Sequence, residues 1–361
     1  MVDVKRLWSF SLPRVRNVMP APPLVHEGLL WASFDWFGRQ TYESLLIAFE
    51  PTTGDEQWRL PAHGAVCRGA EPVSGGVFWP QMSPPKLRSV DRTGTVRWEW
   101  HLDGGNIWAV PVSAGSIVHS TGGTTEGRTQ RLVREDGATG WTHREADTLS
   151  IPVIGRATTD EELYVTTSRY FDDGVAFALG VDSGRLRWRV TYPNRYLRVG
   201  PERDGLLPLF DQQTLRLLDR TTGQETASLE IWPTSTNAHI ETSSQAGRWV
   251  VVSDSSTRQS EIVVVEAGAD AALTVAWRRR FPEQLASSPV SLPTGDWAVL
   301  RSDGHLLIID PLTGTHSDSG RVVKAGDAYG RLVAHDDLVI AAQGRELVAL
   351  TLGASSTDGG R

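Results

Sequence analysis

The sequence predicts an all-β chain that folds as a single eight-bladed β-propeller of four-stranded antiparallel blades, closed by a strand from each terminus. Three observations over the 361 residues support this prediction: a repeated strand–turn–strand motif, a tryptophan that recurs at blade spacing, and incomplete repeats at the two ends that complement each other. A self-similar unit of this kind defines the architecture before any local pattern does.

The repeated motif is an apolar strand, a tight turn and a second strand that opens on tryptophan. Its clearest copies end at Trp58 and Trp188, and degraded copies cover residues 217–223 and 308–314. The turn carries a glycine, Gly54 or Gly184, because a positive φ costs little there. Tryptophan four residues later can pack as a wedge between adjacent sheets. The motif therefore predicts the hairpin of the two outer strands of a propeller blade.

The tryptophan-bearing strand recurs at about 40 to 50 residues, the length of a four-stranded blade. It is found at Trp8, Trp58, Trp98, Trp141, Trp188 and Trp277, with vacant places near Thr226 and Ser317. The eight first strands are predicted to begin near Pro22, Glu71, Val110, Ile151, Gly200, Ile240, Ser288 and Arg331. We expect Trp58, Trp98, Trp188 and Trp277 to be wedges between blades without a functional role.

The ends of the chain predict how the propeller closes. The last repeat, residues 331–352, holds three strands and lacks a tryptophan strand, whereas residues 6–10 form a tryptophan strand without a blade. We expect residues 4–11 to pair beside residues 347–350, which leaves no exposed sheet edge in that blade. Residues 1–352 are therefore predicted to form one propeller, and the small polar residues 353–361 a disordered tail.

The composition and charge of the chain bear on which classes of partner it can bind. A net charge of −7 and a pI near 5.7 give no electrostatic footprint for nucleic acid. The arginines are scattered, apart from the run Arg278, Arg279 and Arg280. The amino terminus has no apolar signal region, and no apolar run approaches the about 20 residues that span a bilayer. The sequence predicts a monomeric, cytoplasmic protein without nucleic-acid or membrane partners.

The pattern Asp-x-x-Thr-Gly-x-x-x-Trp, preceded by Leu/Ile-x-Ala-Leu/Phe, resembles the pyrroloquinoline-quinone-type propeller repeat. That family includes quinoprotein alcohol dehydrogenases and the propeller lipoprotein of the outer-membrane assembly machinery. The resemblance covers about residues 4–352 and implies an eight-bladed propeller, with little information about activity. The dehydrogenases carry a vicinal disulfide, a calcium site and a catalytic aspartate, and they are exported. This chain has one cysteine, Cys67, and no export signal, so we expect a propeller without the quinone and without another cofactor.

Other motifs favour structural interpretations. Residues 122–129 nearly match the motif of a phosphate-binding loop. Such a loop must be followed by a helix, but residues 130–134 are typical of a strand. Residues 180–184 are not a Gly-x-Ser-x-Gly elbow, and the histidines lack metal-ligand spacing. A hairpin turn is a better interpretation than a calcium loop for Asp172, Asp173 and Gly174.

Candidate site residues come from the geometry expected of a propeller, in which the loops leading into the first strands form a funnel. Most such positions carry small residues, as residues 286–288 do, but several carry large polar or aromatic ones. We predict His239, Glu241 and Tyr196 as catalytic candidates, and Arg68, Trp108, Arg198 and Tyr329 as ligand-binding candidates. The alternative is that these side chains fill a wet channel, with water satisfying their polar groups.

The loops that join the middle strands share the predicted funnel face. Residues 34–42 and 168–172 are long and aromatic, and exposed aromatics beside arginine are typical of binding hot spots. Trp36, Arg169 and Tyr170 are therefore further binding candidates. The alternative is that these rings fold back over their own blades.

Two classes of function remain from the sequence, with a quinoprotein dehydrogenase as a third that lacks its marks. The first is a scaffold that binds a protein, or a small ligand such as an anion recognised by arginine, at the funnel face. The second is a cofactor-independent enzyme of the cyclase or lyase type, with His239, Glu241 and Tyr196 in acid–base roles. An enzyme requires an acid and a base close together in an enclosed pocket, and a binder requires an open aromatic face.

Overall fold

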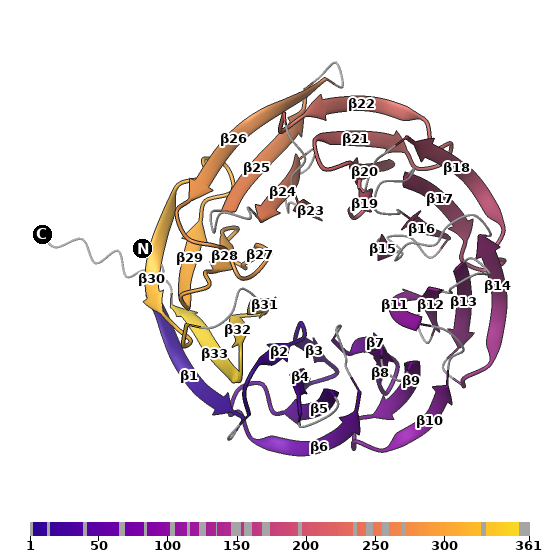
Figure 1. The fold of residues 1–361 in the computed structure, drawn as a ribbon. Coiled ribbons are helices and arrows are strands. Elements are labelled where there is room, and N and C mark those ends of the chain that lie inside the picture. The colour runs from indigo at the N-terminus through magenta and orange to yellow at the C-terminus, as the bar shows by residue number, and fades with distance from the viewer. Residues whose placement is uncertain are drawn as a thin grey trace, which may run out of the picture. The chain divides into compact units, whose positions relative to one another are not determined.

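The computed structural model is all-β, and its description covers most of the chain (Figure 1). The described residues are 3–12, 15–38, 42–64, 69–82, 85–101, 105–113, 116–122, 128–134, 136–145, 153–154, 161–167, 174–193, 197–233, 237–242, 248–254, 260–268, 272–325 and 330–353. These residues contain strands and turns and no helix. The chain divides into two compact units, unit 1 with residues 1–70, 258–260 and 281–361, and unit 2 with residues 71–257 and 261–280.

Unit 1 contains three antiparallel sheets among its described residues. The first has the order β1-β33-β32-β31, with β1 (Asp3–Ser11), β31 (Gly330–His335), β32 (Leu338–Gln343) and β33 (Glu346–Gly353). The second consists of β2 (Val18–Pro20), β3 (Leu24–His26), β4 (Leu29–Phe37), β5 (Tyr42–Phe49) and β6 (Glu56–His63). The third consists of β27 (Val290–Ser291), β28 (Trp297–Leu300), β29 (His305–Ile309) and β30 (His316–Arg321).

Unit 2 contains five four-stranded antiparallel sheets among its described residues. They are β7 (Glu71–Val73), β8 (Gly76–Met82), β9 (Pro85–Asp91) and β10 (Val96–His101); β11 (Gly105–Ser113), β12 (Ser116–Gly122), β13 (Arg128–Arg134) and β14 (Thr139–Glu145); β15 (Val153–Ile154), β16 (Glu162–Thr167), β17 (Gly174–Gly180) and β18 (Leu186–Tyr192); β19 (Arg198–Val199), β20 (Leu206–Phe210), β21 (Thr214–Asp219) and β22 (Glu225–Glu230); and β23 (Asn237–Thr242), β24 (Arg248–Asp254), β25 (Ser260–Ala267) and β26 (Leu273–Phe281). The first strands of successive sheets contact one another, from β7 through β11, β15 and β19 to β23.

The amino-terminal strand completes the last sheet of the chain, as the sequence predicts. Strand β1 runs antiparallel to β33, with Val4 opposite Leu352 and Phe10 opposite Leu347, and a register shift between Arg6 and Trp8. Without β1 this sheet would hold only the three strands predicted for residues 331–352. The edge of β33 is therefore covered by a segment from the other end of the sequence.

One sheet differs from the four-stranded prediction. Its expected first strand near Pro22 is divided into β2 and β3, and both pair with β4. Proline has no backbone N–H to donate and fixes its own φ. Pro20 ends β2, and Pro22 and Pro23 separate it from β3, so the chain cannot pair continuously along β4.

The repeated tryptophans pack over the turn glycines of the following sheet. The indole Nε1 of Trp188 donates a hydrogen bond of 2.6 Å to the carbonyl of Arg220, three residues before Gly223. A Cβ on Gly223 would lie 2.6 Å from the indole ring, and its φ is +69°. Both the backbone conformation and the tryptophan therefore require glycine at this turn.

The same arrangement recurs in other sheets. Trp8 donates a hydrogen bond of 2.8 Å to the carbonyl of Pro51, near Gly54. Trp141 donates a hydrogen bond to the carbonyl of Val181, near Gly184. A Cβ added to Gly137 would lie 3.4 Å from the Trp98 ring. The predicted wedge is therefore confirmed for Trp98 and Trp188. Trp58 makes an edge contact with Trp31 in its own sheet, at 5.2 Å between ring centroids.

In sheets whose side chains the structure describes, burial separates the two middle strands from the outermost one. All seven residues of β17 are buried, whereas exposed and half-buried residues alternate along β6. A strand covered on both faces is apolar throughout, and one covered on a single face alternates. The inner strands therefore form the core, and the outermost strands carry the polar side chains.

Candidate binding surface

One end of each sheet carries the turn from the second strand to the third, and we call it the hairpin end. In four sheets a backbone N–H just after the fourth strand donates to a carbonyl of that hairpin. The pairs are Gly64 to Tyr42 at 2.7 Å, Ile231 to Gln213 at 2.8 Å, Val322 to Gly304 at 2.9 Å and Leu12 to Arg345 at 3.0 Å. The middle-strand hairpins therefore share an end with the connections that lead to the next first strand, as the sequence predicts.

Buried polar side chains gather at the hairpin end. Most lie where the second strand ends or the third begins: Asp35, Ser44, Gln81, Thr166, Asp211, Ser253, Ser260, Glu261 and Gln343. Such groups need hydrogen-bond partners when they are removed from water. Several hold loops: Ser44 donates to the carbonyl of Gly64, and Gln343 Nε2 donates 2.8 Å to the carbonyl of Ser302. Sequence reasoning missed this set, although a polar residue near the end of several apolar second strands is a visible signal.

Asp211 shows how such a residue orders a hairpin. Its side chain is fully buried and accepts backbone hydrogen bonds from Gln213 and Thr214, at 3.3 and 2.9 Å. Its other oxygen accepts two hydrogen bonds from Arg216, at 3.1 and 2.9 Å. The Arg216 guanidinium also lies 5.0 Å from the centre of the Tyr192 ring. Burial and the nearby Glu225 raise the pKa of Tyr192 to about 12, so the hydroxyl stays protonated.

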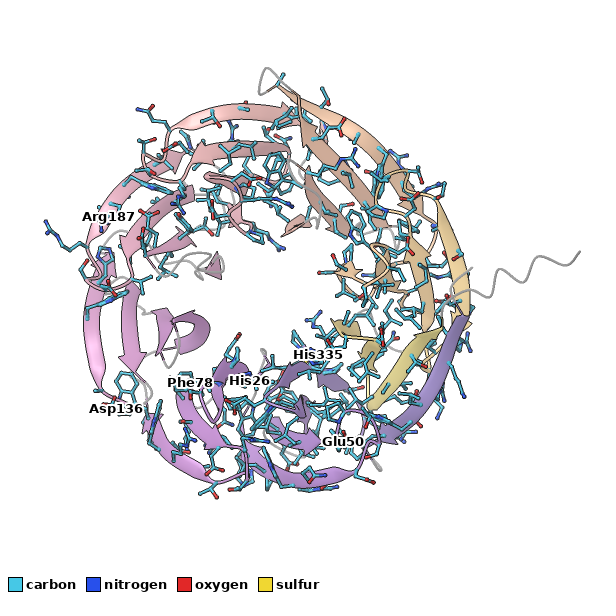
Figure 2. The ribbon with its side chains drawn as sticks, turned by 180° about the vertical axis from the view of Figure 1, so that it is seen from behind. His26, Glu50, Phe78, Asp136, Arg187 and His335 are labelled. Atoms are coloured by element: carbon cyan, nitrogen blue, oxygen red, sulfur yellow. The ribbon has the colours of Figure 1, made fainter. Side chains whose placement is uncertain are left out.

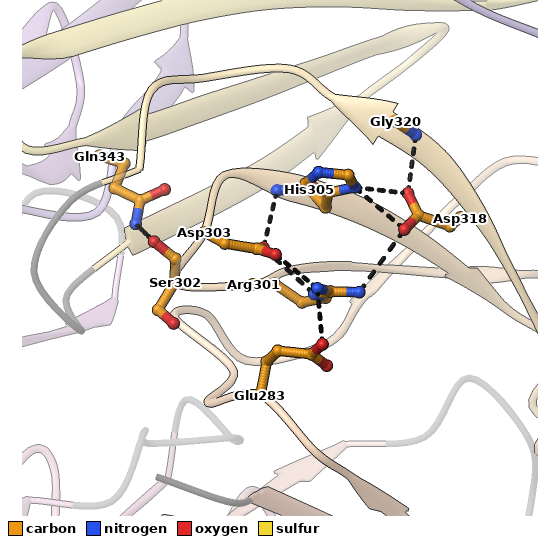
Figure 3. Close-up of polar contacts among 8 residues, drawn as sticks. All are labelled: Glu283, Arg301, Ser302, Asp303, His305, Asp318, Gly320 and Gln343. Carbon is orange, nitrogen blue, oxygen red and sulfur yellow. Dashed lines mark hydrogen bonds and ion pairs between the residues drawn. The ribbon is translucent and has the colours of Figure 1, made fainter.

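In unit 1 the hairpin end of the β27–β30 sheet carries a network of charged side chains centred on Arg301 (Figure 3). Arg301 pairs with Asp303, with Glu283 at 3.0 Å and with Asp318 at 3.5 Å. His305 Nδ1 lies 3.0 Å from both carboxylate oxygens of Asp318. The Arg301 side chain is 15% exposed, so the network fixes this short turn.

The charges of this network act on Asp318. Burial alone would raise the pKa of its carboxyl, but the hydrogen bonds from His305 and from the Gly320 backbone, together with the charge of Arg301, lower it. Asp318 is therefore a carboxylate at neutral pH and keeps His305 and Arg301 in place.

The hairpin between β4 and β5 presents aromatic rings at its tip. Phe34 is buried, and Trp36 is half-buried with its Nε1 donating 3.0 Å to Glu43. Phe37 and Tyr42 are 56% and 40% exposed and contact each other edge to face, at 5.1 Å between ring centroids. Both sequence interpretations therefore apply: Phe34 folds into its own sheet, and the two outer rings face solvent.

The predicted site residues are only partly described. Arg198 is half-buried in β19, opposite Phe210. Trp108 lies in β11, and His239 and Glu241 lie two apart in β23, but the description of these three covers the backbone alone. Alternate residues of a strand point to the same face, so the backbone agrees with the prediction that His239 and Glu241 share a side. Strands β19 and β23 contact each other, which places Arg198 and His239 on neighbouring first strands.

The remaining candidates, Arg68, Arg169, Tyr170, Tyr196 and Tyr329, lie outside the described residues. Their roles stay predictions.

In unit 2, a charged cluster on β9 and β10 contains a carboxyl group with a shifted pKa. Glu99 lies 2.9 Å from Lys86, 2.5 Å from Arg88 and 2.9 Å from His101. Burial alone would raise the pKa of Glu99, but the hydrogen bonds from Lys86 and Arg88 lower it from 4.5 to about 2. The folded state therefore binds a proton at Glu99 more weakly than the unfolded state does.

We expect Glu99→Gln to destabilise the protein at neutral pH and progressively less in acid. The stabilisation from a lowered carboxyl pKa is present above about pH 4.5 and is lost as the pH falls toward about 2. Glu99 is partly exposed, so we expect about 1–3 kcal/mol at neutral pH. The measurement is the free energy of urea unfolding of both proteins at pH 7, 5 and 3. A difference that stays constant over this range would contradict the assignment.

Comparison with known proteins shows which family model and which solved structures this chain resembles. Residues 42–198 match the family model described as outer membrane protein assembly factor BamB. BamB from Moraxella catarrhalis is 17% identical, with 96% of this chain and 99% of that chain covered and a TM-score of 0.65. Quinohemoprotein alcohol dehydrogenase from Comamonas testosteroni is 14% identical, with 99% and 78% covered and a TM-score of 0.68. Sqt1 from Saccharomyces cerevisiae is 14% identical, with 98% and 100% covered and a TM-score of 0.70.

These matches identify the fold as a β-propeller, and identities this low show the fold alone. They confirm the predicted resemblance to the pyrroloquinoline-quinone-type repeat propeller family. No match to the chain was found among curated protein sequences.

One feature of the quinone-dependent dehydrogenases, the vicinal disulfide, cannot form in this chain. A vicinal disulfide needs two cysteines, and the chain has only Cys67. Within the described part of the chain, no group of three or more histidine, cysteine, aspartate or glutamate side chains is placed to hold a metal ion. A search of the same residues for a helix long and apolar enough to cross a membrane also found none.

Proposed function

We propose that the eight sheets are the blades of one closed β-propeller, and that this propeller is a scaffold that binds a protein partner at the hairpin end of its blades. The pairing of β1 with β33 supports closure, because it joins the two ends of the chain in one sheet. The similarity to BamB, whose family description names it as an assembly factor, agrees with a role in contacting other proteins.

The observation that carries the proposal is the exposed ring pair of Phe37 and Tyr42. These are the two aromatic residues among the exposed large hydrophobic side chains of the described residues. Aromatic anchors at the centre of an interface supply much of its binding energy, and each ring buries a large apolar area when it is covered. The hairpin that carries them is held by the Gly64 to Tyr42 hydrogen bond, so the rings are presented on a fixed base.

Photo-cross-linking tests the proposal. With a benzophenone side chain in place of Phe37, we expect one partner protein to be cross-linked reproducibly in cells. Tyr42→Ser in the same protein should reduce the yield at least about tenfold, the equivalent of ~1.4 kcal/mol of binding. A control is Leu312→Ser, because Leu312 is 59% exposed and lies in the turn from β29 to β30, at the opposite end of its sheet. Equal loss from Leu312→Ser, or no loss from Tyr42→Ser, would place the interface elsewhere.

The enzyme alternative rests on His239, Glu241 and Tyr196. The described side chains add no acid–base pair to it, and it stays a prediction. The cytoplasmic location also stays a prediction from the sequence.

A further inference from the structure

The run of three consecutive arginines in this acidic chain lies on strand β26, in a different sheet from the hairpin of β4 and β5. Arg278, Arg279 and Arg280 occupy the last part of β26, just before Phe281. In a strand, alternate side chains point to the same face. Arg278 and Arg280 therefore share one face of the sheet, and both lie beside Glu261 on β25.

Glu261 holds this face together. Its side chain is 8% exposed, and its Oε1 accepts a hydrogen bond of 3.1 Å from Arg280 Nε. Its Oε2 accepts a hydrogen bond of 2.5 Å from the indole Nε1 of Trp232. The same oxygen lies 3.8 Å from Arg278 Nη1. Arg278 Nη2 also donates 2.7 Å to the carbonyl of Ile231. The arginines are thus fixed in position by a buried carboxylate and by the segment after β22.

The contacts of this face among the described residues leave an excess of positive charge. One carboxylate, Glu261, forms ion pairs with two guanidinium groups, so these three side chains carry a net charge of about +1. The whole chain has a net charge of −7. Arg280 is bonded to Glu261 through Nε and is 76% exposed, so its Nη groups reach solvent. A guanidinium binds a carboxylate most strongly through two parallel N–H donors, and the Nη groups of Arg280 are placed for that.

The strand that carries these arginines is also a sheet edge. Strand β26 is last in the order β23-β24-β25-β26 and has nine residues. Val275, on the same strand, is 39% exposed. An edge strand offers backbone N–H and C=O groups to an added strand.

We propose that β26 is a docking edge for an extended acidic segment of a partner protein. The segment adds a strand beside β26 and places carboxylates at alternate positions opposite Arg278 and Arg280. Backbone hydrogen bonds supply the pairing, and the arginines select the charge. This surface belongs to another sheet than the β4–β5 hairpin and does not depend on the proposed function.

The test uses a fluorescein-labelled nonapeptide of alternating glutamate and valine, with its binding to the full-length protein measured by fluorescence anisotropy. We expect saturable binding that weakens as salt rises. Arg280→Gln should weaken it about tenfold, and Arg278→Gln with Arg280→Gln should abolish it. Glutamine keeps a donor for Glu261, and thermal unfolding checks that each variant is folded.

The matched control is Arg187→Gln. Arg187, labelled in Figure 2, is exposed and lies on β18, which is also the outermost strand of its sheet. Its removal should leave binding unchanged. A peptide N-methylated at alternate residues should not bind, because it cannot form the added strand.

Four outcomes would overturn the proposal. The first is unchanged binding in the double arginine variant, and the second is equal binding of a lysine–valine peptide, which would indicate unselective strand addition. The third is tighter binding of a single-stranded oligonucleotide that competes with the acidic peptide. The fourth is that none of these probes binds, in which case the arginines would serve only to prevent edge-to-edge aggregation.

Discussion

Deleting residues 1–11 should turn the protein into an aggregating species of strongly reduced stability. The deletion removes β1, which pairs with β33 along its whole length, and exposes the edge of β33. It also removes Trp8 and Phe10, whose rings pack on Phe49 at 5.8 and 5.0 Å between centroids. Full burial of a large apolar side chain contributes about 1.5–3 kcal/mol. The two rings are partly buried, so their loss costs at most about 3–6 kcal/mol. Size-exclusion chromatography and the unfolding midpoint are the measurements.

The control is a deletion of similar length at the other end, residues 354–361, which come after β33 in the sequence. We expect this variant to keep the elution volume and unfolding midpoint of the full chain. If the 1–11 deletion remained monomeric with an unchanged midpoint, the pairing of β1 with β33 would contribute little to stability, and the proposed closure would lose its support.

Trp188→Ala should cost about 3–5 kcal/mol of unfolding free energy, the range for a large buried aromatic residue. Trp188 is 7% exposed and stacks on Tyr164, at 6.1 Å between ring centroids. The substitution also leaves the Arg220 carbonyl without the indole N–H that it accepts at 2.6 Å. Urea unfolding measures the effect, and a loss below about 1 kcal/mol would contradict the wedge.

Two glycine variants separate the wedge from backbone strain. Gly205 and Gly223 both have positive φ, +80° and +69°, but a Cβ at Gly205 meets open space and one at Gly223 meets the Trp188 ring at 2.6 Å. We expect Gly205→Ala to cost about 1 kcal/mol from backbone strain alone. Gly223→Ala should cost ~1–3 kcal/mol more, and the excess should disappear when Trp188→Ala is present, since residues in contact couple. Equal costs for the two variants would show that the tryptophan does not press on the turn.

The candidate surface was predicted less completely than the fold. The sequence indicates that residues 34–42 form an aromatic loop, but only packing shows that Phe34 is buried whereas Phe37 and Tyr42 face solvent. The Arg301 network joins residues of three segments, so no local pattern announces it. Glu261 was overlooked for the same reason, because its partners Trp232 and Arg280 lie on other segments of the chain.

Patterns in the sequence were enough to predict the repeat, the turn glycines and the pairing of the two chain ends. These features depend on local chemistry: a turn needs positive φ, a strand needs its apolar period, and a three-stranded repeat at one end matches an orphan strand at the other. Tertiary structure alone decided which polar side chains are buried, which rings stay exposed and which arginines share a carboxylate. Those outcomes depend on side chains that are distant in sequence and meet only when the sheets pack, so their burial and charge cannot be derived from the residues singly.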